Sequence, residues 1–285
     1  MQGINGNGPA AAPGCAILAR MNPAPHPLSH FLVPDWPAPA NVCALCTTRS
    51  GGTSGPPYDS LNLGTHVGDG VSAVSRNRAV LQDALGARPV FLNQEHGTHM
   101  LGLASNTPDN QPADGAFTRE RGLACTIMVA DCLPILLCDR GGSVVAAVHA
   151  GWRGLAGNRG TGVLEKIYEH FSALAPVESA QPAIELIAWL GPCIGPDAFE
   201  VGADVVTAFI HNHQQALKCF KPQPDGKWLA DLPALARQRL GALGVTQVFG
   251  NDGSPPWCTF GNPSRFFSHR RDRVSGRQAA CVWLE

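Results

Sequence analysis

The chain has 285 residues, of which 44% are hydrophobic and 15% are charged, and its formal net charge is −1. This composition can fill a sizeable core, which excludes disorder over most of the chain, and the balanced charge excludes a general attraction to nucleic acid. No stretch approaches the roughly 20 unbroken apolar residues of a membrane-spanning helix, so we expect no membrane role. The 32 glycines and 24 prolines favour a loop-rich α/β or α+β domain over a helical bundle.

The N-terminal segment differs in composition from the rest of the chain. Residues 1–27 are rich in Ala, Pro, Gly and Asn without periodicity, so we expect a disordered leader there and one domain over residues 28–285. The first 13 residues lack the basic residues and apolar run of a signal peptide. The ten cysteines are therefore expected to be reduced thiols of a cytoplasmic protein, which we expect to be a monomer or weak homodimer.

Patterns of apolar residues predict both strands and helices from residue 42 onward. Strands are expected at residues 42–46, 90–94, 144–149, 184–190, 245–249 and 279–284, and within 124–138 on either side of a turn at 131–134. Helices are expected at residues 71–85, around an apolar face of Val163, Ile167, Phe171 and Leu174, and at 203–218 and 231–243. We predict an α+β fold, a single domain of mixed β-sheets flanked by helices.

Short polar turns follow several of the predicted strands and carry side chains that bind metals. His96, Cys132 and His149 are the notable members, since two imidazoles and a thiolate with an open fourth position are typical of catalytic zinc sites. The spacing alone also fits packed or hydrogen-bonded structural residues, and His99 offers a competing His-x-x-His pair. Cys138 cannot join Cys132 at one metal if the run is extended, because six residues span about 20 Å.

Ordered motifs over residues 30–285 resemble the YfiH-type family, also described as laccase-domain, multicopper polyphenol oxidase or purine nucleoside phosphorylase proteins. The matching segments are Thr47–Ser54, Ser60–Gly64, His66–Asp69, Asn77–Arg78, Gln94–Gly97, Ala130–Pro134, His149–Gly154, Gly191–Ile194, Phe199–Gly202, Cys258–Thr259, Phe266–Asp272 and Gly276–Arg277. The resemblance implies a YfiH-like fold and a metal held by His96, Cys132 and His149. The metal is expected to be Zn²⁺, with Cu²⁺ possible in the same site.

We also expect roles for residues around the metal. The expected catalytic residues are Cys132, Asp131, Arg49 and Arg153, with Asp131 a proton shuttle by adjacency alone. The expected substrate- and phosphate-binding residues are Arg49, Asn62, His66, Arg270 and Arg271, since arginine recognises anions through paired donors.

This chain departs from the family pattern at two positions. Glu95 replaces an apolar residue, and alternation in an extended segment would point it away from His96 to solvent. His269 replaces a tyrosine and could keep one of its hydrogen-bonding roles. The roles of Cys193 and Cys258 are left undefined.

The family resemblance implies a zinc-dependent enzyme acting on purine nucleosides and phosphate. The expected reactions are phosphorolysis of adenosine, inosine and S-methyl-5′-thioadenosine, and deamination of adenosine. Two alternatives stay open: a laccase-like polyphenol oxidase with copper in the same site, and a cell-wall precursor peptide amidase with Cys132 as nucleophile and His149 as base. A non-catalytic metal-binding protein is a third.

Other cysteine and histidine pairs have simpler interpretations. Cys43 and Cys46 lie in a predicted strand without a second Cys-x-x-Cys, which favours packing over a zinc knuckle or a redox pair. His211 and His213 resemble a copper motif, but a spacing of two on a helix points the rings in different directions. Because multicopper oxidases need several His-x-His pairs and this chain has one, a multicopper site is excluded.

Overall fold

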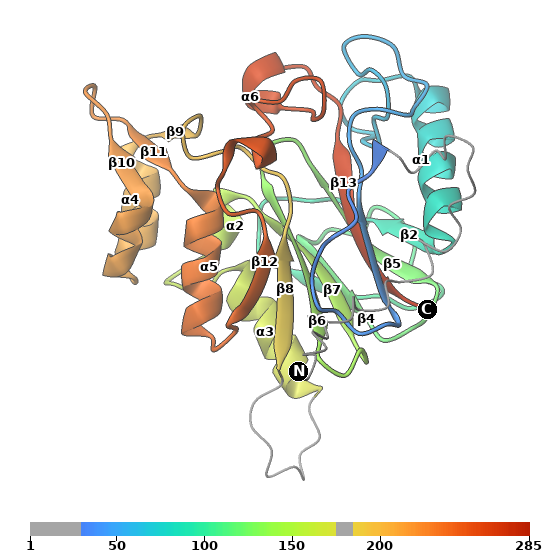
Figure 1. Cartoon of the computed structure of the whole chain (residues 1–285), viewed down its shortest axis with the longest axis horizontal. Helices are drawn as coiled ribbons and strands as arrows, with labels where there is room; N and C mark the ends of the chain where they lie inside the picture. Colours follow the sequence, from blue (N-terminus) through green and yellow to red (C-terminus); the bar gives the residue numbers. More distant parts are fainter. Residues whose placement is uncertain (1–29, 175–184) are drawn as a thin grey trace, which may run out of the picture.

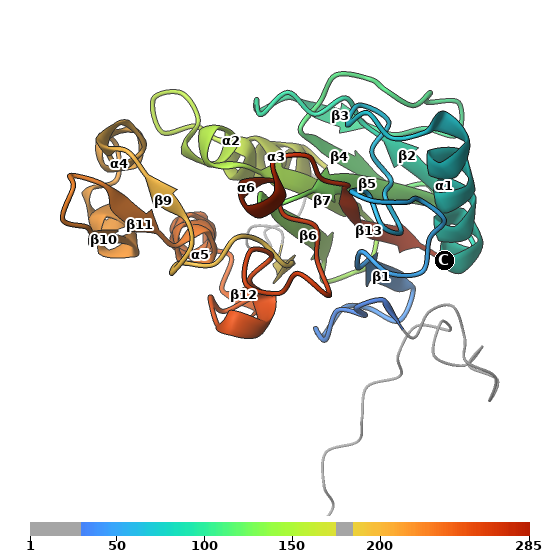
Figure 2. The same ribbon diagram turned by 90° about the horizontal axis from the view of Figure 1, so that it is seen from above.

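The computed structural model describes residues 30–174 and 185–285, and the expected leader at residues 1–27 lies outside them. Two sheets face each other, and helices cover their outer faces (Figure 1 and Figure 2). The six-stranded sheet has the order β12 (Gln247–Gly250), β8 (Leu186–Leu190), β6 (Leu133–Asp139), β7 (Val145–Ala150), β4 (Gly115–Thr118), β3 (Met100–Gly102). The four-stranded sheet has the order β1 (Val42–Cys46), β13 (Gln278–Leu284), β5 (Leu123–Val129), β2 (Arg88–Phe91).

A third, three-stranded sheet stands to one side of the two large ones. It is formed by β10 (Phe220–Pro222), β11 (Trp228–Ala230) and β9 (Glu200–Val201). Together with α4 (Ala203–Ile210) it makes the projection at the left of Figure 1. The sequence pattern did not predict these strands, because each has only two or three residues and so no periodicity to detect.

Side-chain alternation along the central strands builds the core on both faces of each sheet. In β6, Ile135 and Leu137 pack toward the helices, whereas Leu136 and Cys138 pack toward the other sheet. β13 alternates in the same way, with Ala280 facing the six-stranded sheet and Cys281 facing outward. Strands buried on both faces are continuous apolar runs, which is why these strands were detectable in the sequence.

Helices cover the outer faces of the two sheets as their apolar spacing predicts. The four-stranded sheet is covered by α1 (Val71–Leu85), which buries Val74, Leu81 and Leu85 and ends at Gly86 with φ 63°. The six-stranded sheet is covered by α2 (Trp152–Ala156), α3 (Val163–Ala173) and α5 (Leu232–Ala242), and α4 packs beside α2. The predicted apolar face of α3 is confirmed, since Val163, Ile167 and Phe171 are buried.

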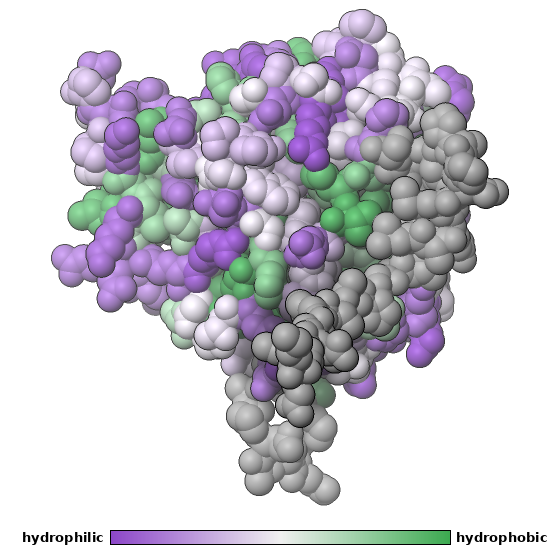
Figure 3. Space-filling model, viewed as in Figure 1, coloured by the Kyte–Doolittle hydropathy of each residue, from purple (hydrophilic) through white to green (hydrophobic). Residues whose placement is uncertain are grey.

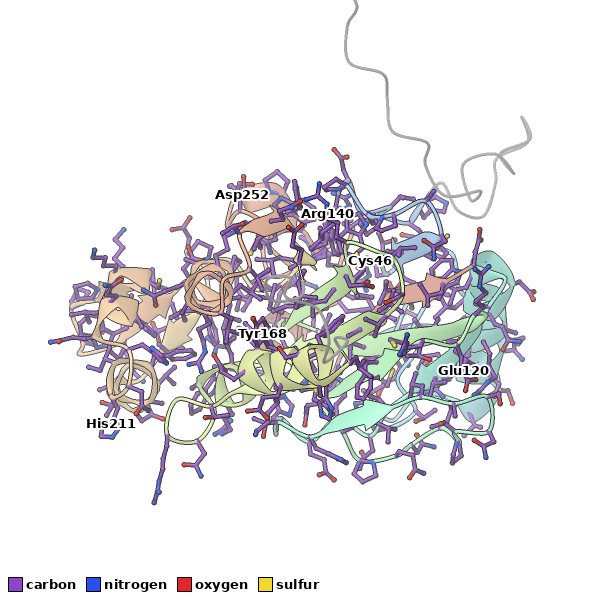
Figure 4. The ribbon with its side chains drawn as sticks, turned by 90° about the horizontal axis from the view of Figure 1, so that it is seen from below. Cys46, Glu120, Arg140, Tyr168, His211 and Asp252 are labelled. Atoms are coloured by element: carbon purple, nitrogen blue, oxygen red, sulfur yellow. The ribbon has the colours of Figure 1, made fainter. Side chains whose placement is uncertain are left out.

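The single helix predicted over residues 203–218 is wrong. α4 ends at Ile210, and a 3₁₀ helix, Gln214–Cys219, follows after a break at residues 211–213. Asn and His have low helix propensity, and His211 is exposed at the end of α4 (Figure 4). The histidine pair therefore lies at a helix end rather than along a helix face.

The expected α+β fold with mixed sheets and flanking helices is confirmed. On the face seen in Figure 3, hydrophobic residues show in small groups between hydrophilic ones. Among residues 30–174 and 185–285, no helix has the length and hydropathy needed to cross a membrane.

The cysteines follow the expectation of reduced thiols with one exception. Eight cysteines of the described residues are free, whereas Cys43 is disulfide-bonded. Cys43 and Cys46 are both fully buried, on opposite faces of β1. Opposite faces exclude a shared metal or a redox pair between these two residues.

Candidate metal centre

Strand topology brings His96, Cys132 and His149 to one rim between the two large sheets. β2 runs parallel to β5, so the segment after β2, which carries His96, leaves the sheet at the same edge as the end of β5. The turn from β5 to β6 crosses from one sheet to the other and carries Cys132. His149, near the end of β7, pairs with Pro134 at the start of β6.

The three side chains form a compact group of metal-ligating atoms. One ligand atom from each of His96, Cys132 and His149 lies within 4.8 Å of the others, the one group of this kind among the described residues. The Sγ of Cys132 is 3.7 Å from Nε2 of His96, and the two imidazole rings meet edge to face with centroids 4.7 Å apart. The predicted grouping of these residues is therefore present.

A buried carboxylate, Asp114, organises this group. Its Oδ1 accepts hydrogen bonds from Nδ1 of His149 and from the backbone N–H of His96, both at 2.8 Å. Its Oδ2 accepts the backbone N–H of Gly97 at 2.6 Å and that of Glu95 at 3.3 Å. Because Asp114 occupies Nδ1 of His149, Nε2 is the nitrogen left to bind a metal, and such carboxylate partners are typical of metal-binding histidines.

The loop that carries His96 is also tied to β5. The side chain of Gln94 accepts from the Met128 N–H and donates to the Met128 carbonyl, both at 2.8 Å. His96 itself has φ 61°, and Asp131 beside Cys132 has φ 96°. Backbone in this left-handed region is strained for residues other than glycine and clusters at functional sites. Glu95 is exposed, as expected.

The charges of the three side chains favour a thiolate. Burial alone would raise the pKa of Cys132, but the charge and hydrogen bond of His149, helped by His96, lower it to about 6. Burial would lower the pKa of His149, and Cys132 with Asp114 raises it to about 9. Burial would raise the pKa of Asp114, and its hydrogen bonds from His149, Gly97 and His96 hold it below the usual value.

A cleft of about 500 Å³ opens directly on this group. One part of its wall is apolar, with Leu92, Met128, Val129, Ile194 and Phe199. Another part is basic, with His66, His269, Arg270, Arg273 and Arg277. An apolar wall with a few convergent polar groups is typical of a small-molecule site.

The structure brings only some of the predicted site residues into this cleft. His66, Asp131 and Arg270 line it with the three metal-ligating residues. Each carboxylate oxygen of Asp131 accepts one hydrogen bond, from Thr259 Oγ1 at 2.7 Å and from the Arg270 N–H at 2.6 Å. Asp131 therefore ties the turn of Cys132 to the two C-terminal motifs.

Four predicted residues are not part of the cleft wall. Arg49 donates to the carbonyls of Asp59 and Pro263 and to the Asp59 carboxylate. Arg153 is exposed and stacks on Trp152.

The other two, Asn62 and Arg271, lie in the loops around the cleft. Asn62 is fully buried, and its Oδ1 accepts the N–H groups of Gly64 and Arg277. Arg271 donates to the carbonyls of Thr259, Phe260 and Phe266. Both residues shape loops rather than face the cavity.

Two cysteines that the sequence left undefined pack beside the site. Cys193 and Cys258 lie opposite each other in an isolated bridge, both as free thiols. Cys258 Sγ accepts the N–H groups of Gly195 and Gly261. Together they hold the loop next to Thr259, which binds Asp131.

Sequence reasoning missed Asp114, Phe199, Arg273 and Arg277 as site residues. The sequence contains one indication of the role of Asp114, because it is a lone acidic residue between Ala113 and the apolar start of β4. Arg277 left another, its place in a matching motif directly before the last strand.

The donor set fits a bound metal ion. Two neutral imidazoles and a thiolate are the ligands that Zn²⁺ takes at catalytic sites with one open position, and Cu²⁺ binds the same donors. The low pKa of Cys132 means that its thiol gives up the proton readily near neutral pH, which metal binding requires.

Comparisons with known proteins cover nearly all of the described chain. Residues 43–285 match the family model described as multi-copper polyphenol oxidoreductase laccase. A Pseudomonas aeruginosa protein named purine nucleoside phosphorylase is 48% identical over 259 residues, 90% of this chain and 100% of that protein. Purine nucleoside phosphorylase YfiH of Escherichia coli is 45% identical with the same coverage. Among solved structures, a Neisseria meningitidis protein is 45% identical, with a TM-score of 0.81 over 90% of this chain and 100% of that chain.

Proposed function

Because the chain belongs to the family described as multi-copper polyphenol oxidoreductase laccase, and its relatives in Pseudomonas aeruginosa and Escherichia coli carry the name purine nucleoside phosphorylase, we propose that its cleft binds purine nucleosides and phosphate. The observation that supports this most is the composition of the cleft. One cavity combines a metal-ligating group, an apolar wall and several basic side chains. A purine nucleoside offers a flat base for the apolar wall, and phosphate offers charge for the basic groups.

The metal ligands are His96, Cys132 and His149, and the ion we propose is Zn²⁺. When bound, the ion supplies Lewis acidity at the mouth of the cleft. Asp114 holds His149 in one tautomer, and Gln94 fixes the segment of His96 against β5. These contacts preorganise the ligands, so that little reorganisation is needed when the ion binds.

For phosphorolysis, the residues of this chain bind and orient the two substrates. The ring of Phe199 and the side chains of Ile194 and Met128 exclude water around the base. Arg270 lies on the cleft wall, where its charge attracts the phosphate, and His66 on the same wall offers a hydrogen bond to it. A bound phosphate offsets the positive charge that develops on the ribose as the glycosidic bond breaks.

We propose adenosine, inosine and S-methyl-5′-thioadenosine as substrates, and deamination of adenosine as a second reaction. For deamination, Asp131 is the carboxylate placed to move a proton, since it lines the cleft beside Cys132. Replacing Asp131 with Asn should then reduce inosine formation from adenosine more than it reduces adenine release.

One geometric observation favours a different activity. Cys132, His149 and Asp114 form a thiol–imidazole–carboxylate series, with the imidazole between the other two groups. This arrangement also suits a cysteine amidase with Cys132 as nucleophile and His149 as base. No observation of this kind favours a multicopper oxidase, because the described residues contain one metal-ligating group and not several.

Metal removal and reloading separate the three activities, which are nucleoside turnover, peptide hydrolysis and phenol oxidation. We would treat the full-length protein with a chelator, reload it with Zn²⁺ or Cu²⁺, and follow adenosine, inosine, a phenol and a muropeptide by chromatography. Nucleoside turnover that is lost on chelation and restored by Zn²⁺ supports the proposal. Peptide hydrolysis that survives chelation would instead support the amidase, and phenol oxidation that scales with loaded copper would support the oxidase.

A further inference from the structure

We propose that Arg277 is the anchor of an oxyanion subsite in this cleft, and that its ligand is inorganic phosphate. The inference rests on the proposed function, and it deepens it by naming the residue that holds the second substrate. It also replaces the expectation that Arg49 and Arg271 bind phosphate, because neither lines the cleft.

The first argument is that Arg277 is a half-buried cation with no acidic side chain at ion-pair distance among the described residues, although Asp131 and Cys132 act on it from farther away. Ion pairs with acidic groups are present for Arg49, Arg78 and Arg239, but none includes Arg277. Burial lowers the pKa of the Arg277 guanidinium, so its charge is partly deprived of water. A desolvated charge is stabilised by a counter-ion, and the cavity beside it can admit one.

The second argument is that, in the part of the chain that the structure describes, two of the three guanidinium nitrogens of Arg277 are free to donate hydrogen bonds to a ligand. Nη1 of Arg277 donates to the carbonyls of Ser275 and Gly276, at 2.8 and 3.0 Å. Within the described residues, Nε and Nη2 have no hydrogen-bond partner. This pair of donors on one edge of the guanidinium matches the bidentate pattern by which arginine binds phosphate.

The third argument is that residues of two family motifs, Ser60–Gly64 and Gly276–Arg277, pack closely around the Arg277 side chain. A Cβ on Gly64 would lie 2.8 Å from Cγ of Arg277, so only glycine leaves room for the arginine stem. Asn62 Oδ1 accepts the Arg277 N–H at 2.9 Å and the Gly64 N–H at 3.0 Å. A Cβ on Gly276 would lie 2.7 Å from the ring of Phe267. The segment Ser60–Gly64 therefore fixes the position of Arg277.

The fourth argument is electrostatic. The charge of Arg277 acts on Cys132 and Asp131, and it helps to lower the pKa of His66 after burial, so it faces the same space as the metal ligands. Arg273 adds a second charge from the rim, at φ 63° in a turn closed by the Val274 N–H to the Asp272 carbonyl at 2.7 Å. An oxyanion bound here would lie between Arg277 and the metal ligands.

The test measures phosphate binding directly on the full-length zinc-loaded protein, without nucleoside, by calorimetry. The variants are Arg277→Gln, Arg277→Lys and Gly64→Ala. Arg140→Ala is the matched control, because it removes one positive charge from an exposed ion pair with Glu185, at the far end of β6 from Cys132 and about 26 Å away. Arg140 is labelled in Figure 4. Circular dichroism melts of each variant show whether it is folded.

We expect Arg277→Gln to weaken phosphate binding about 10–100-fold, the loss typical of two charge-assisted hydrogen bonds. Arg277→Lys should recover part of this loss, since lysine keeps the positive charge but lacks the paired donors of the guanidinium group. Gly64→Ala should weaken binding while Arg277 is still present, because it displaces the arginine stem. In steady-state assays the KM for phosphate should rise, with the KM for nucleoside unchanged.

Two results would overturn the inference. The first is a folded Arg277→Gln protein that binds inorganic phosphate as tightly as the wild type. The second is Arg277-dependent binding of a nucleoside 5′-monophosphate with no binding of inorganic phosphate, which would assign the subsite to a phosphate ester. Failure of the proposed function looks different: phosphate binding would still depend on Arg277, but no nucleoside would be turned over.

Discussion

Asp114 and His149 share a hydrogen bond of 2.8 Å between Oδ1 and Nδ1, and both side chains are almost completely buried. Because the same oxygen also accepts the backbone N–H of His96, one carboxylate holds both the ring of His149 and the backbone of His96. Asp114 thus links β4, β7 and the loop after β2. We expect its loss to disturb metal binding more than any substitution outside the ligands themselves.

The first prediction concerns this carboxylate. Asp114→Asn keeps the size of the side chain but removes its charge, so it no longer favours the Nε2-ligating form of His149. We expect metal affinity to fall about 10–100-fold, as for other partners of metal-binding histidines. Competition with a chromophoric chelator measures the affinity.

The matched control for Asp114→Asn is Asp139→Asn. Asp139 is also buried and accepts the N–H groups of Ser143 and Val144, in a turn at the opposite end of β6 from the cleft. It should lose stability and keep its metal affinity. Equal affinities for the two variants would show that Asp114 acts only on folding.

The second prediction is the pH dependence of Cys132 reactivity in the metal-free protein. Since the pKa of Cys132 is lowered to about 6, the reactive thiolate is scarce below pH 6 and dominant above it. Alkylation by iodoacetamide should therefore rise through about pH 6, and Zn²⁺ should protect the residue. Peptide mass spectrometry separates Cys132 from Cys46, Cys125 and Cys281, whose pKa burial raises.

His149→Ala tests the cause of this shift. Without the imidazolium beside it, the Cys132 pKa should rise, and the alkylation profile should move to higher pH. His99→Ala is the control, because His99 binds the Pro112 carbonyl and is not part of the metal-ligating group. An alkylation profile that stays near pH 6 without His149 would contradict the assigned cause.

The third prediction separates Arg49 from substrate binding. Arg49→Ala removes the hydrogen bonds that tie its loop to Asp59 and Pro263, which should cost about 1–3 kcal/mol of unfolding free energy. Urea denaturation measures this loss. The KM for phosphate should not change, and a selective rise in that KM would restore Arg49 as a phosphate ligand.

The fourth prediction concerns the pKa of His66. Burial first, and then the charges of Arg277 and Arg78, hold this pKa below its usual value. Arg277→Gln should raise it, so that His66 stays protonated to a higher pH, whereas Arg140→Ala should leave it unchanged. A proton NMR titration of the His66 ring measures both values, and equal values would place the Arg277 charge away from His66.

The sequence predicted the long elements because their patterns are strong. β5, β6 and β13 are buried on both faces and appear as apolar runs, and α1 ends at Gly86 as its C-terminal signal indicates. The strands β3 and β9 are too short to show an alternation of apolar and polar residues from which a strand could be predicted. The break after α4 falls at three residues of low helix propensity. An apolar pattern followed over about 11 to 18 residues does not detect so short a break.

The site divides in a similar way. His96, Cys132 and His149 were found from residue type and resemblance, because metal ligands are chemically distinctive. Asp114 was missed because its role depends on a contact across 35 positions with His149, which no local pattern contains. Arg49 was predicted to bind phosphate from its motif, and its hydrogen bonds to the carbonyls of Asp59 and Pro263, which join two loops, could not be predicted from that motif.

The most direct test of the account is the identity of the products formed from inosine with and without phosphate. Zinc-loaded wild-type protein and Cys132→Ala would be compared by chromatography. We predict hypoxanthine and ribose 1-phosphate in equal amounts, only in the presence of phosphate and only from the wild type. Absence of any product from wild type with confirmed zinc content, or equal turnover by Cys132→Ala, would contradict the assignment of this cleft.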